Sequence, residues 1–101
     1  MATAALSPRA RQDLLDAARW IARDNQIAAQ GLRRAVVEAA QRIGAHPAVG
    51  SVRPELADEP VRFLTLVGFP YLIVYDSGRD PPLILRMLHG ARDLPSVLGR
   101  S

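Results

Sequence analysis

The 101-residue sequence contains no cysteine, which excludes a disulfide-stapled scaffold and a zinc site built on thiolates. No apolar run approaches the roughly 18 residues that a membrane-spanning helix requires. Residues 1–6 lack the charged start and the long apolar stretch of a secretory signal peptide. We therefore expect a cytoplasmic protein that does not bind membranes, folded as one domain over residues 1–101.

Lysine is also absent, so all thirteen basic residues are arginines, against ten acidic residues. Arginine binds phosphate and carboxylate groups through pairs of parallel hydrogen bonds, whereas lysine acts as a point charge. A genome rich in G and C explains the same bias more simply, because its codons favour arginine and alanine. The net charge of +3 permits an acidic or nucleic-acid partner and requires neither.

Two amphipathic helices are predicted in the first half of the chain. Ser7 and Pro8 form a helix start, because serine caps orphan N–H groups and proline needs no partner at the first position. The first helix ends near residues 24–25, and the second ends at residues 46–47, where His46 precedes a proline. Their apolar stripes are Ala10, Leu14, Ala17, Ala18 and Ile21, then Leu32, Val36, Ala39 and Ile43. The short turn between them makes the helices antiparallel neighbours.

A proline- and glycine-rich loop over residues 46–60 leads into three predicted strands, over residues 61–67, 71–76 and 83–88. Short connections favour an antiparallel meander, and residues 2–6 can add a strand at an edge. We therefore predict an α+β fold: an N-terminal helical hairpin packed on one face of a three- to four-stranded antiparallel β-sheet, followed by a short C-terminal turn or helix.

The last strand places Arg86 among apolar neighbours. Strict alternation puts Leu83, Leu85 and Met87 on one face and Ile84, Arg86 and Leu88 on the other. An arginine in such a place must be paired, because an unpaired buried charge is costly. Two interpretations stay open: a phosphate or carboxylate site on the sheet, or a structural ion pair with Asp76 or Asp93.

His89 and Arg92 follow Arg86 closely and are expected at the same end of the sheet. Together the three residues can form an anion site in which His89 acts as an acid or a base. The alternative is that His89 and Arg92 only hold the C-terminal turn by hydrogen bonds.

The aromatic residues are few. Tyr71 and Tyr75 are predicted on one strand face with Ile73 between them, either to stack on bases or to lie at the core edge with their hydroxyls in solvent. Trp20, beside the first apolar stripe, is expected to pack in the core. We expect no metal and no cofactor, because the two histidines are far apart and no glycine-rich phosphate loop precedes a helix.

Several segments, taken in order, resemble a known family. They are Ser7-Pro8-x-Ala10, Trp20-Ile21-Ala22-x-Asp24-Asn25, His46-Pro47-x-x-Gly50, Arg53-Pro54-Glu55-Leu56, Gly68-x-x-Tyr71-x-Ile73-x-Tyr75 and Leu85-Arg86-x-Leu88-His89-Gly90-Ala91-Arg92-Asp93. From about residue 4 to residue 98 the chain resembles the ParE branch of the ParE/RelE toxin superfamily, the toxin half of type II toxin–antitoxin modules.

The resemblance implies a helical hairpin on an antiparallel sheet and a growth-inhibiting toxin. It implies that a cognate, ParD-like antitoxin neutralises the toxin by wrapping its C-terminal segment around it. It also implies DNA gyrase as the target, inhibited by direct binding and without enzymatic activity.

Two alternatives remain. One is a RelE-type endoribonuclease that cuts mRNA on the ribosome, with Arg86 and His89 as its catalytic residues. The sequence departs from that pattern, because it has no lysine and ends in a short turn. The other is an inactive member that only binds antitoxin. The candidate residues for binding a target or partner are Arg62, Tyr71, Tyr75, Arg86, His89 and Arg92, and residues 92–100 are expected to form part of the gyrase surface.

Overall fold

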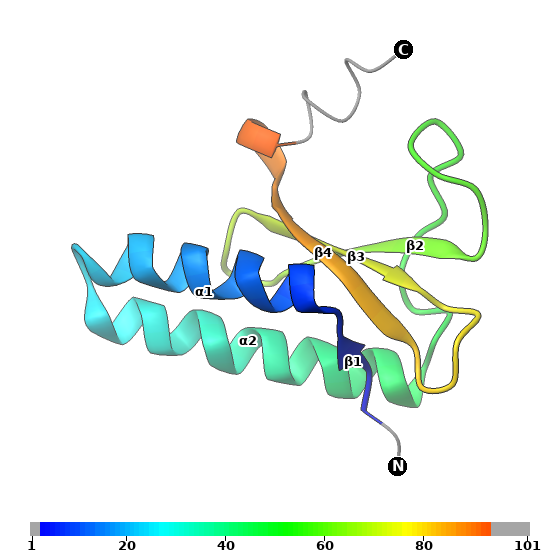
Figure 1. Cartoon of the computed structure of the whole chain (residues 1–101), viewed down its shortest axis with the longest axis horizontal. Coiled ribbons are helices and arrows are strands. Elements are labelled where there is room, and N and C mark those ends of the chain that lie inside the picture. The colour runs from blue at the N-terminus through cyan, green and yellow to red at the C-terminus, as the bar shows by residue number, and fades with distance from the viewer. Residues whose placement is uncertain (1–2, 94–101) are drawn as a thin grey trace.

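The computed structural model describes residues 3–93 as two helices and four strands (Figure 1). In chain order the elements are β1 (Ala5–Leu6), α1 (Pro8–Ala22), α2 (Gln26–Ala45), β2 (Val61–Thr65), β3 (Tyr71–Asp76) and β4 (Leu83–His89). A helical turn begins at Gly90 and continues through residue 93. Among the described residues, neither helix combines the length and apolar character needed to cross a membrane.

The first helix begins where the sequence predicts, and a side chain caps the start of each helix. The Ser7 hydroxyl accepts a hydrogen bond from the Ala10 N–H at 3.0 Å, and Pro8 is the first helical residue of α1. Asn25 caps α2 in the same way, by accepting from the Ala28 N–H at 3.0 Å. The predicted end of the second helix before Pro47 is also confirmed, since α2 ends at Ala45.

The four strands form one sheet in the order β1-β4-β3-β2. The predicted antiparallel meander of β2, β3 and β4 is confirmed, and the N-terminal segment does add an edge strand. That edge strand runs parallel to β4, with Ala5 beside Leu83 and Leu6 beside Ile84, so the sheet is mixed. The parallel pairing gives β1 backbone partners, because the Ala5 and Ser7 N–H groups donate to Pro82 and Ile84 carbonyls.

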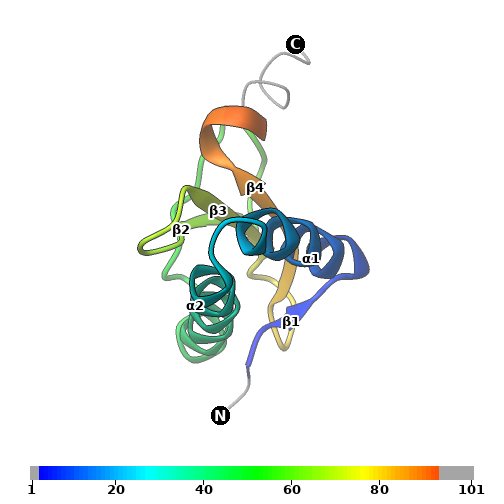
Figure 2. The same ribbon diagram turned by 90° about the vertical axis from the view of Figure 1, so that its left-hand side faces the viewer.

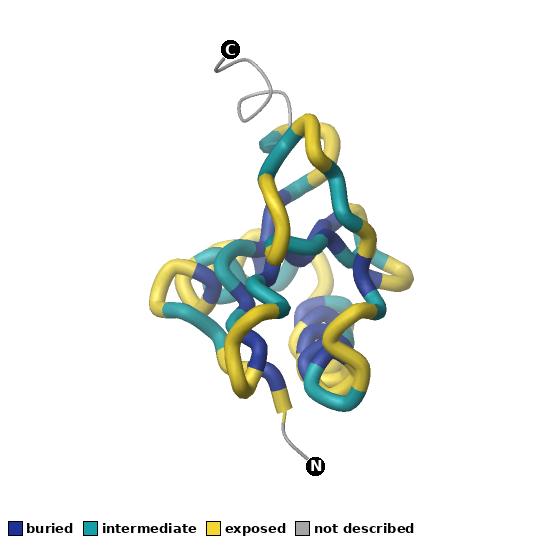
Figure 3. Tube along the Cα trace, turned by 90° about the vertical axis from the view of Figure 1, so that its right-hand side faces the viewer, coloured by how far each residue is buried: buried dark blue, intermediate teal, exposed yellow. Residues whose placement is uncertain are grey.

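The helical hairpin covers one face of the sheet (Figures 1 and 2), as the sequence predicts. The main core lies between the two layers, and the buried segments in Figure 3 run along α2 and β3. Its largest fully buried side chains are Tyr75, Leu32, Ile43, Ile73 and Ile84. The opposite face carries a smaller cluster of Phe63, Leu72, Val74 and Leu88, packed against Leu56, Ala57 and Val61.

A β-bulge interrupts β4. Val74 pairs with Arg86 but Tyr75 pairs with Ile84, so Leu85 has no partner on β3. The Leu85 carbonyl instead accepts a hydrogen bond from the Ser7 hydroxyl at 2.9 Å. The extra residue reverses the alternation, so Ile84 lies in the helix-side core with Met87, away from Leu88. The predicted grouping of Ile84 with Arg86 and Leu88 is therefore wrong.

Trp20 does not pack in the core. Its side chain is 60% exposed, and the Arg23 guanidinium carbon lies 4.9 Å from the ring centroid. The small residues Ala17 and Ala18 occupy the buried face of α1, which leaves the indole on the solvent side of the helix. The predicted core position is wrong, because Trp20 lies off the face of α1 on which Ala17, Ala18 and Ile21 pack against the core.

Candidate functional site

The Arg86 side chain is bound by Asp13 of α1. Arg86 Nε lies 2.8 Å from Asp13 Oδ2, and Arg86 Nη2 lies 3.3 Å from Asp13 Oδ1. The same carboxylate accepts the Met87 N–H at 3.0 Å, where β4 has passed the end of β1 and has a free edge. A single mostly buried carboxylate therefore joins α1 to both the backbone and a side chain of β4.

Of the two interpretations of Arg86, the ion pair is the one that the structure contains. Its partner is neither Asp76, which pairs with Arg79, nor Asp93, so that part of the prediction is wrong. Residues 13 and 86 meet only through the packing of α1 on β4, which no local pattern reveals. The hydrogen bonds donated to Asp13 raise the pKa of Arg86, partial burial opposes them, and the negative charges of Asp13 and Asp93 add to the rise.

His89 and Arg92 hold the C-terminal turn, as the second interpretation predicts. The Arg92 N–H donates to His89 Nδ1 at 3.1 Å, and the His89 N–H donates to Asp93 Oδ2 at 2.7 Å. Arg92 Nε lies 3.3 Å from Asp93 Oδ1. Partial burial raises the pKa of Asp93, but the hydrogen bonds from His89 and Arg92 and their positive charges outweigh it, so the pKa lies below its usual value.

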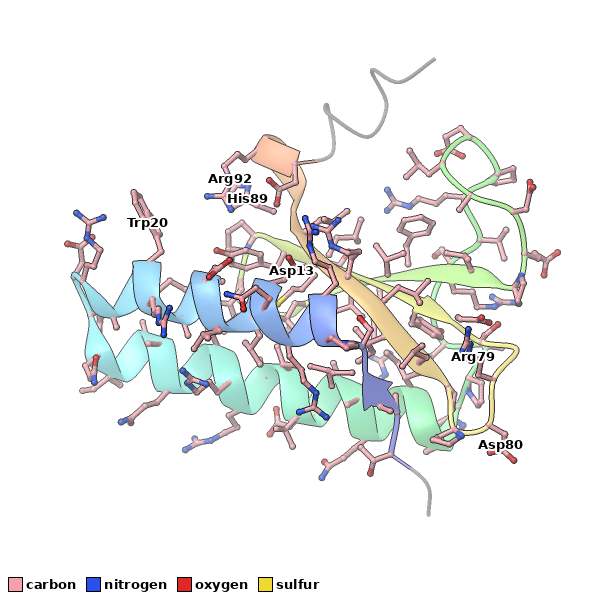
Figure 4. The ribbon with its side chains drawn as sticks, in the orientation of Figure 1. Asp13, Trp20, Arg79, Asp80, His89 and Arg92 are labelled. Atoms are coloured by element: carbon pink, nitrogen blue, oxygen red, sulfur yellow. The ribbon has the colours of Figure 1, made fainter. Side chains whose placement is uncertain are left out.

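These residues border a groove of about 320 Å³ between α1, β4 and the C-terminal turn, which we call the Asp13 groove (Figure 4). It is lined by Asp13, Asp16, Ala17, Trp20, Tyr71, Arg86, Met87, Arg92 and Asp93. Three carboxylates face two guanidinium groups in this lining, so the arginines do not present a free positive charge. The sequence reasoning missed Asp13, Asp16 and Trp20, although their spacing of three and four residues places them on one side of α1.

Tyr71 and Tyr75 lie on the same face of β3 with Ile73, as predicted. The Tyr71 ring meets the His89 ring edge-on, with centroids 5.4 Å apart, and lines the Asp13 groove. Tyr75 is fully buried, and its hydroxyl donates to the Pro47 carbonyl at 2.6 Å and accepts from the Gly50 N–H at 2.8 Å. The expectation that Tyr75 binds a partner or reaches solvent is wrong, because the loop after α2 encloses it.

Arg62 is separated from the other candidates. Its Nη1 donates to the Gly50 carbonyl at 2.8 Å, and its Nη2 lies 3.9 Å from Glu59. It faces Tyr75 across the β2–β3 pair, so both side chains fasten the loop at residues 47–50. The structure brings together Tyr71, Arg86, His89 and Arg92, and it does not bring Arg62 to them. Of the predicted gyrase surface, residues 94–100 lie outside the described residues.

A second groove of about 290 Å³ lies between α2 and β2, and we call it the α2–β2 groove. It is lined by Ala35, Glu38, Ala39, Arg42, Leu64, Thr65, Leu66 and Val67. Val67 is 81% exposed, which is unusual for a large apolar side chain. Ser51 covers the outer edge of β2 at Phe63, and within residues 3–93 no backbone group covers that edge at Thr65.

Within residues 3–93, no group of three or more histidine, cysteine, aspartate or glutamate side chains is placed to hold a metal.

Comparison with known proteins places this geometry in context. The family model described as "ParE toxin of type II toxin-antitoxin system, parDE" matches residues 4–94. A search of curated protein sequences found no match. A solved structure of the chromosomal ParDE TA system from P. aeruginosa superposes with a TM-score of 0.71 at 22% identity, covering 88% of this chain and 96% of that chain. At 22% identity, the similarity to this structure establishes the fold alone.

Proposed function

Because the chain belongs to the ParE toxin family of type II toxin–antitoxin systems, we propose that it is a toxin that inhibits DNA gyrase by direct binding. In this proposal it has no enzymatic activity of its own. A cognate, ParD-like antitoxin neutralises it in the cytoplasm and thereby relieves the inhibition of growth.

The observation that carries the choice of binding over RNA cleavage is the Asp13–Arg86 pair. A nuclease needs a free cation to stabilise the charged phosphate in the transition state. Here the guanidinium of Arg86 is held by the Asp13 carboxylate at 2.8 Å, and Asp16 and Asp93 line the same groove. These carboxylates repel a phosphodiester, so the groove is poorly suited to RNA chemistry.

His89 also forms contacts within the protein. His89 Nδ1 accepts the Arg92 N–H, and its ring packs edge-on against Tyr71. This arrangement fixes the imidazole as part of the turn. It supports a structural role for His89, whose Nδ1 is used to hold the turn.

The α2–β2 groove supports the antitoxin part of the proposal. An extended peptide can pair with the uncovered edge of β2 at Thr65 and place apolar side chains against Leu64, Leu66 and Val67. Glu38 and Arg42 at the rim can fix its register by charge. An antitoxin segment that orders on binding suits such a surface.

The proposal is tested by inducing the chain without its antitoxin and pulse-labelling DNA and protein synthesis. We expect DNA synthesis to fall first, and purified gyrase to lose supercoiling activity when the toxin is added and regain it with the antitoxin. An earlier fall in protein synthesis would instead support the endoribonuclease alternative. Continued growth with folded protein present would leave antitoxin binding as the function.

A further inference from the structure

A third groove of about 230 Å³ lies between the two helices, and we call it the hairpin groove. Arg19 of α1 and Arg33 of α2 line it from opposite sides, Gln26 and Gln30 of α2 complete its polar lining, and the remaining lining residues are alanines. No strand contributes to it. It is therefore separate from both the Asp13 groove and the α2–β2 groove.

The charge of the hairpin groove differs from that of the Asp13 groove. No carboxylate lines it, and within residues 3–93 neither Arg19 nor Arg33 forms an ion pair. Residues 8–45 contain seven arginines and four acidic residues, an excess of three that equals the net charge of the whole chain. The helical hairpin therefore carries the positive charge of the molecule, and the rest of the chain is balanced.

The lining indicates what kind of ligand fits. Two guanidinium groups and two side-chain amides offer several hydrogen-bond donors to one anion, and the alanines allow a backbone to approach closely. A protein partner would need larger apolar or aromatic side chains to form the centre of an interface, and this groove has none. A phosphate backbone needs only positive charge and donors.

We propose that the hairpin groove binds the phosphodiester backbone of a nucleic-acid duplex, with Arg19 and Arg33 as the phosphate contacts. The contact goes beyond the proposed inhibition of gyrase, because it needs neither gyrase nor antitoxin. We expect it to be independent of base sequence, because contacts to phosphate oxygens carry no sequence information directly.

The test measures binding of the purified full-length chain to a short fluorescently labelled DNA duplex over a series of salt concentrations. The double variant Arg19→Gln/Arg33→Gln is compared with the control Arg53→Gln/Arg79→Gln, which removes the same charge outside the hairpin. Far-ultraviolet circular dichroism verifies that both variants are folded. Arg19 and Arg33 are exposed, so their replacement leaves the core intact.

We expect the hairpin variant to weaken binding at least about tenfold and to lower the slope of log K against log salt by about two, while the control stays near wild type. Equal weakening in both variants would show that only net charge matters and would overturn the site. Absence of wild-type binding would overturn it as well. If a duplex of RNA binds as tightly and depends equally on Arg19 and Arg33, the phosphate contact is supported and does not discriminate between the sugars.

Discussion

Tyr71 and Tyr75 lie on one face of β3 and near its opposite ends, yet their surroundings differ. The loop at residues 47–50 encloses Tyr75, whose hydroxyl binds Pro47 and Gly50. Tyr71 borders the Asp13 groove, and within residues 3–93 its hydroxyl has no hydrogen-bond partner. The Tyr75 end of β3, which we call the closed end, is held to the loop by hydrogen bonds. The Tyr71 end, which we call the open end, borders a groove lined by ion pairs.

The comparison of Tyr71 with Tyr75 teaches that the role of a strand side chain depends on which segment of the chain packs over it. Both tyrosines fit the same strand pattern, and both were candidates for binding. At the end of β3 near residues 47–50, Arg62 adds a second hydrogen bond to this loop, donated to the Gly50 carbonyl. At the other end, Asp13 of α1 holds β4 by accepting the Met87 N–H, and the ring of Tyr71 lines the Asp13 groove.

The largest effect is expected from breaking the fastening at the open end. Asp13→Ala removes the acceptor of Arg86 and of the Met87 N–H. We expect a loss of about 3 kcal/mol in the free energy of unfolding, measured by urea titration. Asp16→Ala is the control in the same helix, because Asp16 is exposed and, among residues 3–93, its carboxylate accepts a hydrogen bond only from Gln12. Equal losses in both variants would contradict the role given to Asp13.

The closed end is tested by the pair Tyr75→Phe and Tyr71→Phe. Removal of the Tyr75 hydroxyl leaves the Gly50 N–H and the Pro47 carbonyl without their partner, so we expect a loss of about 2 kcal/mol. The matching change at Tyr71 is expected to cost less than about 0.5 kcal/mol, because the part of the chain that the structure describes gives its hydroxyl no hydrogen-bond partner. If thermal unfolding shows similar losses for both, the two ends do not differ as described.

A smaller, local effect is expected at the C-terminal turn. The pKa of Asp93 lies below its ordinary value of 3.8, so its carboxylate stabilises the turn at neutral pH. This contribution is lost as the pH falls below 3.8 and through the folded pKa. Amide hydrogen exchange at His89 should therefore lose protection at low pH, because its N–H donates to Asp93. Asp93→Asn should remove that pH dependence, and its persistence in this variant would contradict the assignment.

The smallest effect on stability is expected at Trp20. The side chain is 60% exposed, so Trp20→Ala should change the free energy of unfolding by about 0.5 kcal/mol or less. Exposed tryptophan beside arginine is typical of residues that dominate protein interfaces. If the proposed function holds, the same variant should inhibit gyrase more weakly while it stays folded. A loss above about 1 kcal/mol would instead indicate core packing.

The sequence predicts the fold well where the signal is local. Ser7 caps α1 because its side chain satisfies an N–H group of the adjacent turn, and Pro47 stops α2. Two features escaped prediction. The direction of β1 depends on pairing with a strand near the other end of the chain, and the bulge at Leu85 depends on the partner strand.

The candidate site was predicted in part, for the same reason. His89, Arg92 and Asp93 are sequence neighbours, so their turn could be anticipated from spacing alone. The partner of Arg86 lies in α1, and only tertiary packing brings the two residues together. The exposure of Trp20 is equally a tertiary property, since a helical pattern places a residue on a boundary without saying what covers it.

The parallel pairing of β1 with β4 determines when, during its synthesis, the chain can fold. Residues 5–6 and Asp13 leave the ribosome first, but their partners in β4 lie more than seventy positions later, with Asp13 and Arg86 separated by 73 residues. Domains whose contacts span the chain order late, because the loop must close before the contacts form. We expect a nascent chain that ends before Leu83 to lack protease resistance. The growing polypeptide therefore stays without its final surface until β4 has been translated.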